Sequence, residues 1–422
     1  KKGRNLNMKK TRIGVVGIGR GAMLIRYCRD AKNAELVAIC DKWEEGLNRK
    51  KEEINDDKIT YYTSFDEFLN HDMDVVFLAN YATEHAPFAI RAMEKGMHVV
   101  SEVLPVQTMK EAVELVETVE RTGKIYAYCE NYCYMGAVRE MKKLYREGKL
   151  GEFEYGEGEY MHNCEPIWPR ITYGDKDHWR NNIYATFYCT HSIGPLLHIT
   201  GLKPVKVTGF EMPFNKRCAR MGAKSGHSGM EIITLENGAI LKSIHGLGPS
   251  KDSIWYSIYG SMGRLESSRE DAECGGVNRI YVNLDKEEGM SKNNVISYSP
   301  TDEIAEQGVG HGHGGSDYYA LYQIFEKLAG NHDAETIDVY EALDMFLPGL
   351  FAYRSILNGG IPMEIPDLRD KKVRDRYRDD TECTDPRVAG DQLIPSYSKG
   401  NPEVPDGQYE IIKQKWLELL KK

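Results

Sequence analysis

The sequence of 422 residues has no apolar run of the roughly 18 residues that a membrane-spanning helix needs. Its polar, basic start, residues 1–10, is not followed by the apolar stretch of a secretory signal peptide. The formal net charge is −9, and Lys and Arg are scattered among acidic residues, which disfavours nucleic-acid binding. We therefore expect no membrane segment and no nucleic-acid partner.

The cysteines show neither the pairing of a disulfide framework nor the spacing of a zinc site. Their number, nine, is odd, and Cys129-x-x-x-Cys133 has no second pair at zinc-finger spacing. Several cysteines lie within apolar strand or helix patterns, as buried thiols do. These features predict a reduced, cytoplasmic protein without a metal site.

A glycine-rich stretch, residues 13–22, is the most informative feature that the sequence contains. It follows an apolar run typical of a strand and precedes a helical pattern, the context in which G-x-G-x-x-G/A binds a dinucleotide. Gly17 would permit the tight turn, Gly19 the close approach of a pyrophosphate, and Ala22 close packing of the helix on the strand. Asp41, at the end of the next apolar strand, would bind the ribose hydroxyls and favours NAD over NADP. The predicted cofactor-binding residues of this segment are Gly17, Gly19, Arg20, Gly21, Ala22 and Asp41.

Strand and helix patterns alternate up to residue 131, which predicts a Rossmann domain with a doubly wound parallel sheet over residues 1–131. Ligands of such sheets lie at the carboxyl ends of the strands. Polar residues that follow these strand patterns are therefore further candidates for cofactor contact. They are Asn80, His85, Glu102, Glu130 and Asn131.

After residue 146 the patterns change to longer strands with alternating polarity, linked by hairpin signals such as Asn237-Gly238. They predict an α+β domain over residues 132–365 with a large, mostly antiparallel open sheet. Residues 285–310 are predicted to be irregular, and residues 366–422 to form an irregular tail with a last helix over 408–421. One face of an open sheet needs cover, which predicts a homodimer or homotetramer.

This order of domains resembles the Gfo/Idh/MocA oxidoreductase family, in which a Rossmann domain is followed by an open-sheet domain. The usual signature of the family at the end of the fifth strand is Glu-Lys-Pro, whose lysine assists proton transfer in sugar dehydrogenases. This sequence has Glu102-Val103-Leu104-Pro105 there, without a lysine. The departure disfavours dehydrogenation of a sugar or inositol in the ordinary manner of the family.

Five further stretches resemble the NAD-dependent glycosidase branch of that family, glycoside hydrolase family 109. The segment between Arg180 and Tyr188 differs from that of the galactosaminidases, so a related sulfoquinovosidase branch stays an alternative. The matching stretches are Cys129-Glu-Asn-Tyr-Cys-Tyr134, Gly156-Glu-Gly-Glu-Tyr-Met-His162, Trp179-Arg180, Tyr188-Cys-Thr-His-Ser-Ile-Gly-Pro195 and Gly312-His-Gly-Gly-Ser-Asp317.

Two catalytic candidates lie in these stretches. Alternation along residues 156–162 places Tyr160 and His162 on one strand face, and the resemblance implies Tyr160 as a base and His162 as a contact to sugar hydroxyls. His191 follows Thr190, a candidate N-cap, and would lie in the first turn of a helix. The helix dipole there keeps an imidazole neutral and able to act as acid or base. The alternative for both residues is packing in the core.

Several other residues are predicted to contact cofactor or substrate. Trp179 offers an apolar wall and Arg180 a cationic hydrogen-bond donor, and each can serve the cofactor or the substrate. The alternative is that this segment forms an interdomain ion pair. The resemblance adds Tyr188 to both sets. Neighbours of His311-Gly-His313 supply no carboxylate at ligand spacing, which favours substrate contact by His313 over a metal site. The predicted substrate-binding residues are Tyr160, His162, Arg180, Tyr188, His191 and His313.

The function that the resemblance implies is hydrolysis of a glycoside, by default an α-N-acetylgalactosaminide, with NAD as a recycled cofactor. Transient oxidation at C3 of the sugar acidifies the proton at C2, Tyr160 removes that proton, and the C1 substituent leaves. Water then adds at C1, and the carbonyl group is reduced again. The alternatives are a sulfoquinovosidase of the same superfamily, a sugar or glycoside 3-dehydrogenase with net oxidation, and a non-enzymatic NAD or sugar sensor.

Overall fold

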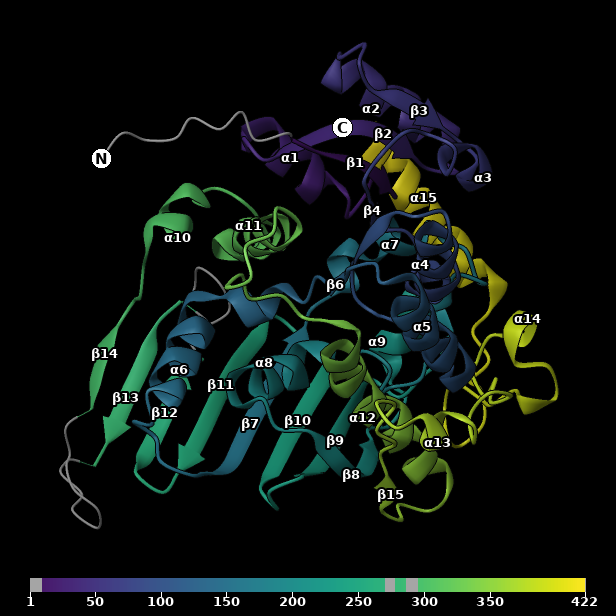
Figure 1. Ribbon diagram of the computed structural model, residues 1–422. Coiled ribbons are helices and arrows are strands. Elements are labelled where there is room, and N and C mark those ends of the chain that lie inside the picture. The colour runs from purple at the N-terminus through teal and green to yellow at the C-terminus, as the bar shows by residue number, and fades with distance from the viewer. Residues whose placement is uncertain (1–9, 270–277, 286–294, 422) are drawn as a thin grey trace, which may run out of the picture. The chain divides into compact units, whose positions relative to one another are not determined.

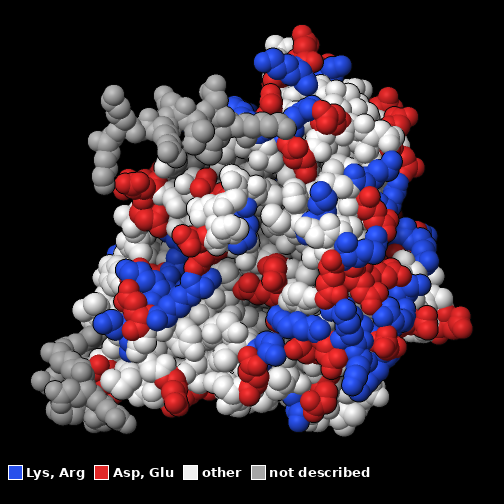
Figure 2. Space-filling view, viewed as in Figure 1, with Lys and Arg blue, Asp and Glu red and all other residues white. Residues whose placement is uncertain are grey.

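The computed structural model describes residues 10–269, 278–285 and 295–421. The chain divides into two compact units. Unit 1 consists of Lys1–Gln107, Glu111–Asn131 and Glu303–Tyr340, and unit 2 of Thr108–Lys110, Tyr132–Asp302 and Glu341–Lys422. Among the described residues, no helix is both long and apolar enough to span a membrane. Figure 2 shows acidic and basic side chains interspersed on one face.

Unit 1 is built on a six-stranded parallel sheet in the order β3-β2-β1-β4-β5-β6 (Figure 1). Its central strands are apolar on both faces, as a parallel sheet covered by helices on both sides requires. The structure thus confirms the predicted doubly wound sheet. The strands are β1 (Thr11–Val16), β2 (Ala34–Cys40), β3 (Thr60–Tyr62), β4 (Val75–Leu78), β5 (His98–Ser101) and β6 (Tyr126–Tyr128). The helices among them are α1 (Ala22–Asp30), α2 (Glu44–Ile54), α3 (Phe65–Phe68), α4 (His85–Glu94) and α5 (Met109–Thr122).

A segment from much later in the chain, Glu303–Tyr340, also belongs to unit 1. It contains α10 (Glu303–Gln307) and α11 (Ser316–Leu328). α11 packs on α1, where the rings of Phe325 and Tyr27 stack with their centroids 5.3 Å apart. The N–H of Tyr128, at the end of β6, donates to the carbonyl oxygen of Ile337 at 2.8 Å. The sequence analysis assigned this segment to the second domain; it folds with unit 1 because its apolar side chains are buried there.

Unit 2 contains a nine-stranded sheet in the order β14-β13-β12-β11-β7-β10-β9-β8-β15 (Figure 1). Neighbouring strands are antiparallel except β7 and β10, which pair in parallel, so the predicted large, mostly antiparallel sheet is confirmed. The strands are β7 (Phe153–His162), β8 (Pro204–Glu211), β9 (Ser228–Leu235), β10 (Ile240–Leu247), β11 (Ser253–Gly260), β12 (Gly263–Ser267), β13 (Ile280–Leu284), β14 (Ile296–Tyr298) and β15 (Met363–Glu364). The helices are α6 (Gly136–Arg146), α7 (Trp168–Thr172), α8 (Thr190–Thr200), α9 (Lys216–Met221), α12 (Val339–Leu357), α13 (Lys371–Arg374), α14 (Pro386–Ala389) and α15 (Asp406–Leu420).

Some local predictions were wrong. β14 and α10 lie within residues 285–310, which were predicted to be irregular, and residues 286–294 of that range lie outside the described residues. The tail contains the short helices α13 and α14, which are too short for a helical period to be visible in the sequence. Cys189, not Thr190, is the N-cap of α8, because Thr190 already has helical geometry. His191 nevertheless lies in the first turn, as predicted.

The position of α8 on the sheet depends on Gly158 in β7. A Cβ at Gly158 would lie 1.8 Å from the carbonyl oxygen of Ser192 in α8. The Ser192 hydroxyl also lies 2.7 Å from that of Ser243 in β10, and the Tyr256 hydroxyl of β11 donates to the carbonyl oxygen of His191. α8 therefore lies directly on β7, β10 and β11, and this contact fixes His191 beside the strand that carries Tyr160.

We expect Gly158→Ala to destabilise unit 2 by about 1–3 kcal/mol, because the added methyl group overlaps the backbone of α8 and the helix must move. Denaturant unfolding followed by tryptophan fluorescence measures the change. Gly407→Ala is the matched control, since a Cβ at Gly407 meets no atom within 4 Å. Equal stability of the two variants would contradict the requirement for a close contact at Gly158.

Candidate active site

The glycine-rich loop of unit 1 has the backbone geometry that close approach of a ligand requires. Gly17 has a φ of +93°, and a Cβ there would lie 2.4 Å from the carbonyl oxygen of Ala79. A Cβ at Gly21 would lie 2.1 Å from the carbonyl oxygen of Gly17, whereas one at Gly19 would meet no atom within 4 Å. Gly17 and Gly21 are thus needed by the turn itself, and Gly19 borders open space, as expected where a pyrophosphate approaches the backbone.

Backbone donors in this loop are available to an anion. The N–H groups of Gly19, Arg20 and Gly21 have no hydrogen-bond acceptor within the described part of the chain. They precede α1, where free N–H groups and the helix dipole favour a phosphate. Asp41 fixes the loop, because its two carboxylate oxygens accept hydrogen bonds of 2.8 Å from the N–H groups of Ile18 and Trp43. The residues present therefore fit the pyrophosphate of a dinucleotide.

Two predicted residues near the strand ends, Asn80 and His85, carry buried polar atoms without a partner. Oδ1 of Asn80 and Nε2 of His85 make no hydrogen bond to any described residue. Nδ1 of His85 lies 2.8 Å from the carbonyl oxygen of Leu104, and burial lowers the pKa of His85 to about 4, so the ring is neutral and Nδ1 donates. Unpaired buried polar atoms are costly, and a bound ligand that pairs with them would remove that cost.

Arg20 joins a network of acidic residues within unit 1. Its Nε lies 2.9 Å from Oε1 of Glu102, and its two terminal nitrogens each lie 2.9 Å from one oxygen of Asp317. Nδ2 of Asn131 lies 3.0 Å from Asp317, and Nδ1 of His313 lies 3.1 Å from both of its oxygens. The structure thus brings four predicted site residues together around Asp317, which the sequence analysis did not select.

This network shifts its two carboxyl groups in opposite directions. Burial would raise the pKa of Asp317, but the hydrogen bond from His313 and the charge of Arg20 outweigh burial and lower that pKa below its usual range. Burial dominates at Glu102 and raises its pKa in spite of Arg20. Asp317 is therefore the anion that balances Arg20. Glu130, also predicted, is fully buried in the same unit.

The histidines near Asp317 are paired with acids. Nε2 of His311 lies 3.3 Å from Oδ2 of Asp30, and His313 contacts Asp317 as above. Within the described ranges, no group of three or more His, Cys, Asp or Glu residues is arranged to hold a metal ion. The eight cysteines in those ranges are free thiols.

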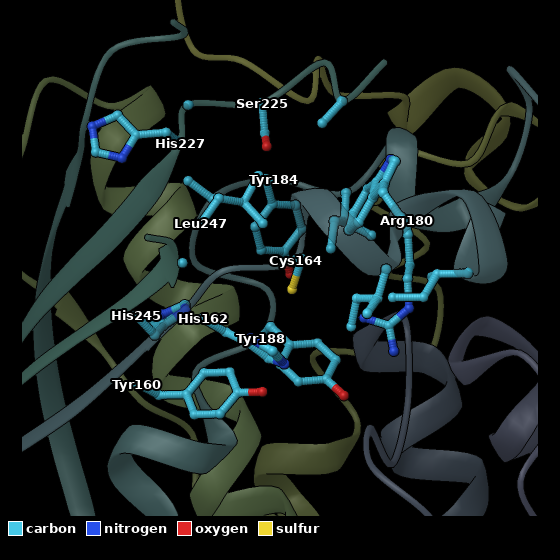
Figure 3. Close-up of a pocket in the computed structure, with 18 residues that line it drawn as sticks. Tyr160, His162, Cys164, Arg180, Tyr184, Tyr188, Ser225, His227, His245 and Leu247 are labelled. Carbon is cyan, nitrogen blue, oxygen red and sulfur yellow. The ribbon is translucent and has the colours of Figure 1, made fainter. Parts of the chain in front are cut away.

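Unit 2 contains a cavity of about 240 Å³ that is lined by residues of β7, β10 and the segments between the strands (Figure 3). Apolar side chains form part of its wall, among them Trp168, Ile171 and Leu247. The titratable side chains in the wall are Tyr160, His162, Cys164, Arg180, Tyr184, Tyr188, His227 and His245.

Tyr160, His162, Arg180 and Tyr188 line this cavity, and His191 contacts Tyr160. The ring centroid of Tyr160 lies 4.6 Å from that of His191, 5.7 Å from that of His162 and 6.5 Å from that of Tyr188. Tyr132, which the sequence analysis did not select, lies 5.4 Å from Tyr160 and 4.5 Å from His191 by the same measure. Alternation along β7 places Tyr160 and His162 on one face, and the packing of α8 on that face brings His191 close to them.

Tyr160 is held as a neutral phenol. Burial, followed by its neighbours Tyr132, Cys164 and Tyr188, raises the pKa of Tyr160 well above its usual value, and the charge of Arg180 acts in the opposite direction. A phenol in this state donates a proton or a hydrogen bond, and it becomes a base only after its own proton has moved to a neighbour.

Arg180 is held at the cavity wall between two aromatic rings. Its guanidinium carbon lies 4.5 Å from the ring centroid of Trp179 and 5.1 Å from that of Tyr188. Trp179 is buried and packs against Phe187. Trp179, Arg180 and Tyr188, which are predicted to contact the cofactor as well as the sugar, belong to unit 2, whereas the glycine-rich loop and His313 belong to unit 1.

The sequence analysis missed three pairs of histidine and carboxylate in unit 2, two of which include a histidine of the cavity wall. Nε2 of His245 lies 2.8 Å from Oε1 of Glu231, and Nδ1 of His162 lies 3.0 Å from Oδ1 of Asp252. His245 lies next to Tyr160, because the two are partners in the parallel register of β10 and β7. Alternation within residues 240–247 gives the face of His245, but it cannot show which strand lies alongside.

We expect Asp317→Asn to destabilise unit 1 by up to about 3 kcal/mol at neutral pH, because the variant removes the charge that balances the Arg20 guanidinium. The pKa of Asp317 is lower in the folded than in the unfolded chain, so its stabilising contribution is complete above about pH 4 and is lost as the pH falls further. The difference in free energy of unfolding between wild type and variant should therefore shrink in acid, as denaturation at a series of pH values measures.

Glu94→Gln is the control for this prediction, since it breaks an exposed ion pair with Arg121 and should change stability by less than about 1 kcal/mol. A difference between wild type and Asp317→Asn that stays constant from neutral pH to about pH 3 would show that Asp317 is not stabilised as an anion.

Comparisons with known proteins agree with this architecture. Residues 11–129 match the family described as "Oxidoreductase family, NAD-binding Rossmann fold" (GFO_IDH_MocA). Proteins named glycosyl hydrolase family 109 protein from Saccharopolyspora erythraea (24% identical, with 85% of this chain and 83% of the relative covered) and from Bacteroides thetaiotaomicron (25% identical, 86% and 85% covered) are similar to this chain. The crystal structure of scyllo-inositol dehydrogenase from Lactobacillus casei with NAD(H) and scyllo-inositol shares the fold, with a TM-score of 0.66, 17% identity, and 85% of this chain and 99% of that chain covered.

The match over residues 11–129 coincides with the strands and helices that form the parallel sheet of unit 1. Unit 1 is therefore an NAD-binding Rossmann domain. The chain is thus similar to the Gfo/Idh/MocA oxidoreductases over residues 11–129 and to proteins named glycosyl hydrolase family 109 over most of its length.

Proposed function

We propose that this protein hydrolyses glycosides through a transient oxidation of the sugar, with NAD as its cofactor. The observation that carries the proposal is the cluster at the unit 2 cavity. There the ring of Tyr160 contacts that of His191, and the charge of Arg180 favours ionisation of Tyr160. The similarity to proteins named glycosyl hydrolase family 109 supports hydrolysis as the net reaction. The segment Glu102-Val103-Leu104-Pro105, which lacks a lysine, supports Tyr160 rather than a lysine as the proton-transfer group.

Unit 1 would hold the cofactor. Bound NAD supplies reversible hydride transfer at C3 of the sugar. The free N–H groups of residues 19–21 would bind its pyrophosphate, and Asp41 would accept hydrogen bonds from its ribose hydroxyls. The unpaired atoms of Asn80 and His85 would find their partners on the cofactor. Glu102, Glu130 and Asn131 stay predicted contacts, with Glu102 and Asn131 held in place by the Arg20–Asp317 network.

The proton steps would begin with ionisation of Tyr160. The carbonyl group at C3 acidifies the proton at C2, but burial keeps Tyr160 protonated. Its proton therefore moves first to His191, whose ring is in contact, and the charge of Arg180 favours the phenolate that remains. The phenolate then removes the C2 proton, the C1 substituent leaves, and water adds at C1.

The wall of the cavity would bind the sugar. His162, oriented by Asp252, and Arg180 offer donors to hydroxyl or carbonyl oxygens. The apolar lining around Trp168 and Ile171 suits the methyl group of an acetamido substituent, so an α-N-acetylgalactosaminide is the default substrate. Arg180 suits a sulfonate equally well, which keeps a sulfoquinovoside as an alternative. His313 stays a predicted substrate contact.

A second candidate is net oxidation of a sugar or glycoside at C3. The structural similarity to scyllo-inositol dehydrogenase, a protein crystallised with NAD(H) and scyllo-inositol, favours this candidate. The two candidates differ in whether NADH accumulates.

We also retain a cytoplasmic location and a homodimer or homotetramer as parts of the proposal.

The test is incubation of the purified protein, without added cofactor, with p-nitrophenyl glycosides of both anomers in deuterated water. We expect release of nitrophenol, deuterium at C2 of the released sugar and no net NADH. Tyr160→Phe should lower the rate about 10²–10⁴-fold, because a phenyl ring cannot accept the C2 proton. Absence of release, with NADH formed when NAD⁺ and free sugars are supplied, would favour the dehydrogenase instead.

Tyr155→Phe is the matched control for Tyr160→Phe. Tyr155 lies on the same strand but on the opposite face, where its hydroxyl donates to Glu157 at 2.8 Å. This variant should retain the wild-type rate. An equal loss in both variants would show that disturbance of β7, and not removal of the Tyr160 hydroxyl, lowers the activity.

A further inference from the structure

A carboxylate is completely buried beneath the cavity of unit 2. Glu231 in β9 has 0% of its surface exposed, and Oε1 lies 2.8 Å from Nε2 of His245 in β10, itself 1% exposed. The second oxygen of Glu231, Oε2, has no hydrogen-bond partner among the described residues. A buried carboxylate with an unused oxygen is costly, and packing alone does not explain its presence.

The histidine of this pair faces the chemistry proposed above. His245 lines the cavity, and in the parallel register of β10 and β7 it is the partner of Tyr160 (Figure 3). Because register partners project from the same face of a sheet, His245 and Tyr160 border the same space. Nε2 of His245 is occupied by Glu231, and Nδ1 has no hydrogen-bond partner in the described part of the chain. The pair thus has one end fixed in the core and one nitrogen free to exchange a proton.

We propose that His245 is the residue that protonates the departing oxygen at C1 and that Glu231 is its positioning residue. This inference rests on the proposed function. The elimination moves protons at two different atoms, C2 and the glycosidic oxygen. Tyr160 and His191, which contact each other, serve the C2 proton, so the glycosidic oxygen needs a separate donor. The carboxylate of Glu231 stabilises the charged imidazolium from which that proton comes.

The elimination step balances as follows. Tyr160 takes the C2 proton, and the electron pair of the C2–H bond forms the C1=C2 double bond. The C1–O bond breaks, its electron pair stays on the aglycone oxygen, and that oxygen receives the proton from Nδ1 of His245. In the return step a water oxygen bonds to C1, one water proton passes to neutral His245, and C2 takes its proton back from Tyr160. Neither step changes the oxidation state of the cofactor.

Another pair in unit 2, in which the histidine is buried and the carboxylate is half-buried, provides the contrast. Nδ1 of His198 lies 2.5 Å from Oε1 of Glu341, and Nε2 of His198 lies 2.6 Å from Nζ of Lys142. Both ring nitrogens of His198 are thus engaged by protein groups, and neither His198 nor Glu341 lines the cavity. This pair ties α6, α8 and α12 together, and it serves as a control for the purely structural effects of removing a carboxylate that pairs with a buried histidine.

The experiment compares glycosides of one sugar that differ only in the aglycone: a methyl glycoside, whose alkoxide leaves poorly, and a 2,4-dinitrophenyl glycoside, whose phenolate leaves without protonation. We expect His245→Gln to lower kcat/KM for the methyl glycoside about 10²–10⁴-fold and for the dinitrophenyl glycoside less than about tenfold. Glu231→Gln should give the same selective loss in smaller measure. If His245 and Glu231 had a merely structural role, each variant would lower kcat/KM for the two glycosides equally.

Glu341→Gln is the matched control, because it removes the same group from the other pair of histidine and carboxylate and should show no dependence on the leaving group. The double variant His245→Gln/Glu231→Gln covers the case in which His245→Gln leaves the Glu231 charge unpaired and fails to fold. Equal losses for the two glycosides in these variants would overturn the role of His245 while leaving the proposed function intact. Failure of the wild type to release either aglycone would overturn both.

Discussion

The contact between α8 and β7 leaves no room for a side chain at Gly158, and the arrangement of the cavity depends on that contact. The carbonyl oxygen of Ser192 occupies the place where a Cβ would project. As a result, the first turn of α8 lies on the strand beside Tyr160, and His191 reaches ring contact with Tyr160 and Tyr132. The absence of a side chain at Gly158 therefore brings His191 and Tyr160 together, since only a glycine lets a helix backbone approach a strand so closely.

Unit 1 depends on charge in a comparable way. Arg20 leaves the glycine-rich loop and meets Asp317, 297 residues later in the chain. Its bidentate contact fastens the segment Glu303–Tyr340 to the loop, and Asp41 fixes the same loop from the other strand end. Protein groups therefore fix the conformation of the loop. A dinucleotide can bind without the entropic cost of ordering the loop. Asn80 and His85, in contrast, keep unpaired atoms that only a ligand would satisfy.

The cavity of unit 2 combines apolar burial with proton-transfer groups whose states are set by their surroundings. Burial keeps Tyr160 protonated, while Arg180, held between Trp179 and Tyr188, favours its ionisation. A balance of this kind suits a group that must give up and regain a proton within one cycle. The buried carboxylate of Glu231 follows the same principle, since it supplies negative charge to a histidine at the cavity wall.

The sequence by itself determined the elements whose signals are local. Apolar strand runs, the glycine-rich loop and Asp41 predicted the Rossmann domain, and period-two alternation placed Tyr160 and His162 on one face of β7. Asp317 and Arg20 are too far apart in the chain for any local pattern to pair them.

Glu231 and His245 are near in sequence, yet their pairing depends on the loop between β9 and β10. Asn237-Gly238 suggests a two-residue turn, but the structure pairs Leu235 with Ala239 around a three-residue loop, residues 236–238. A shift of one residue would place Glu231 and His245 on opposite faces of the sheet, because side chains alternate with period two. Tertiary structure therefore decided which predicted residues became neighbours, since register and packing between distant elements are set by the fold as a whole.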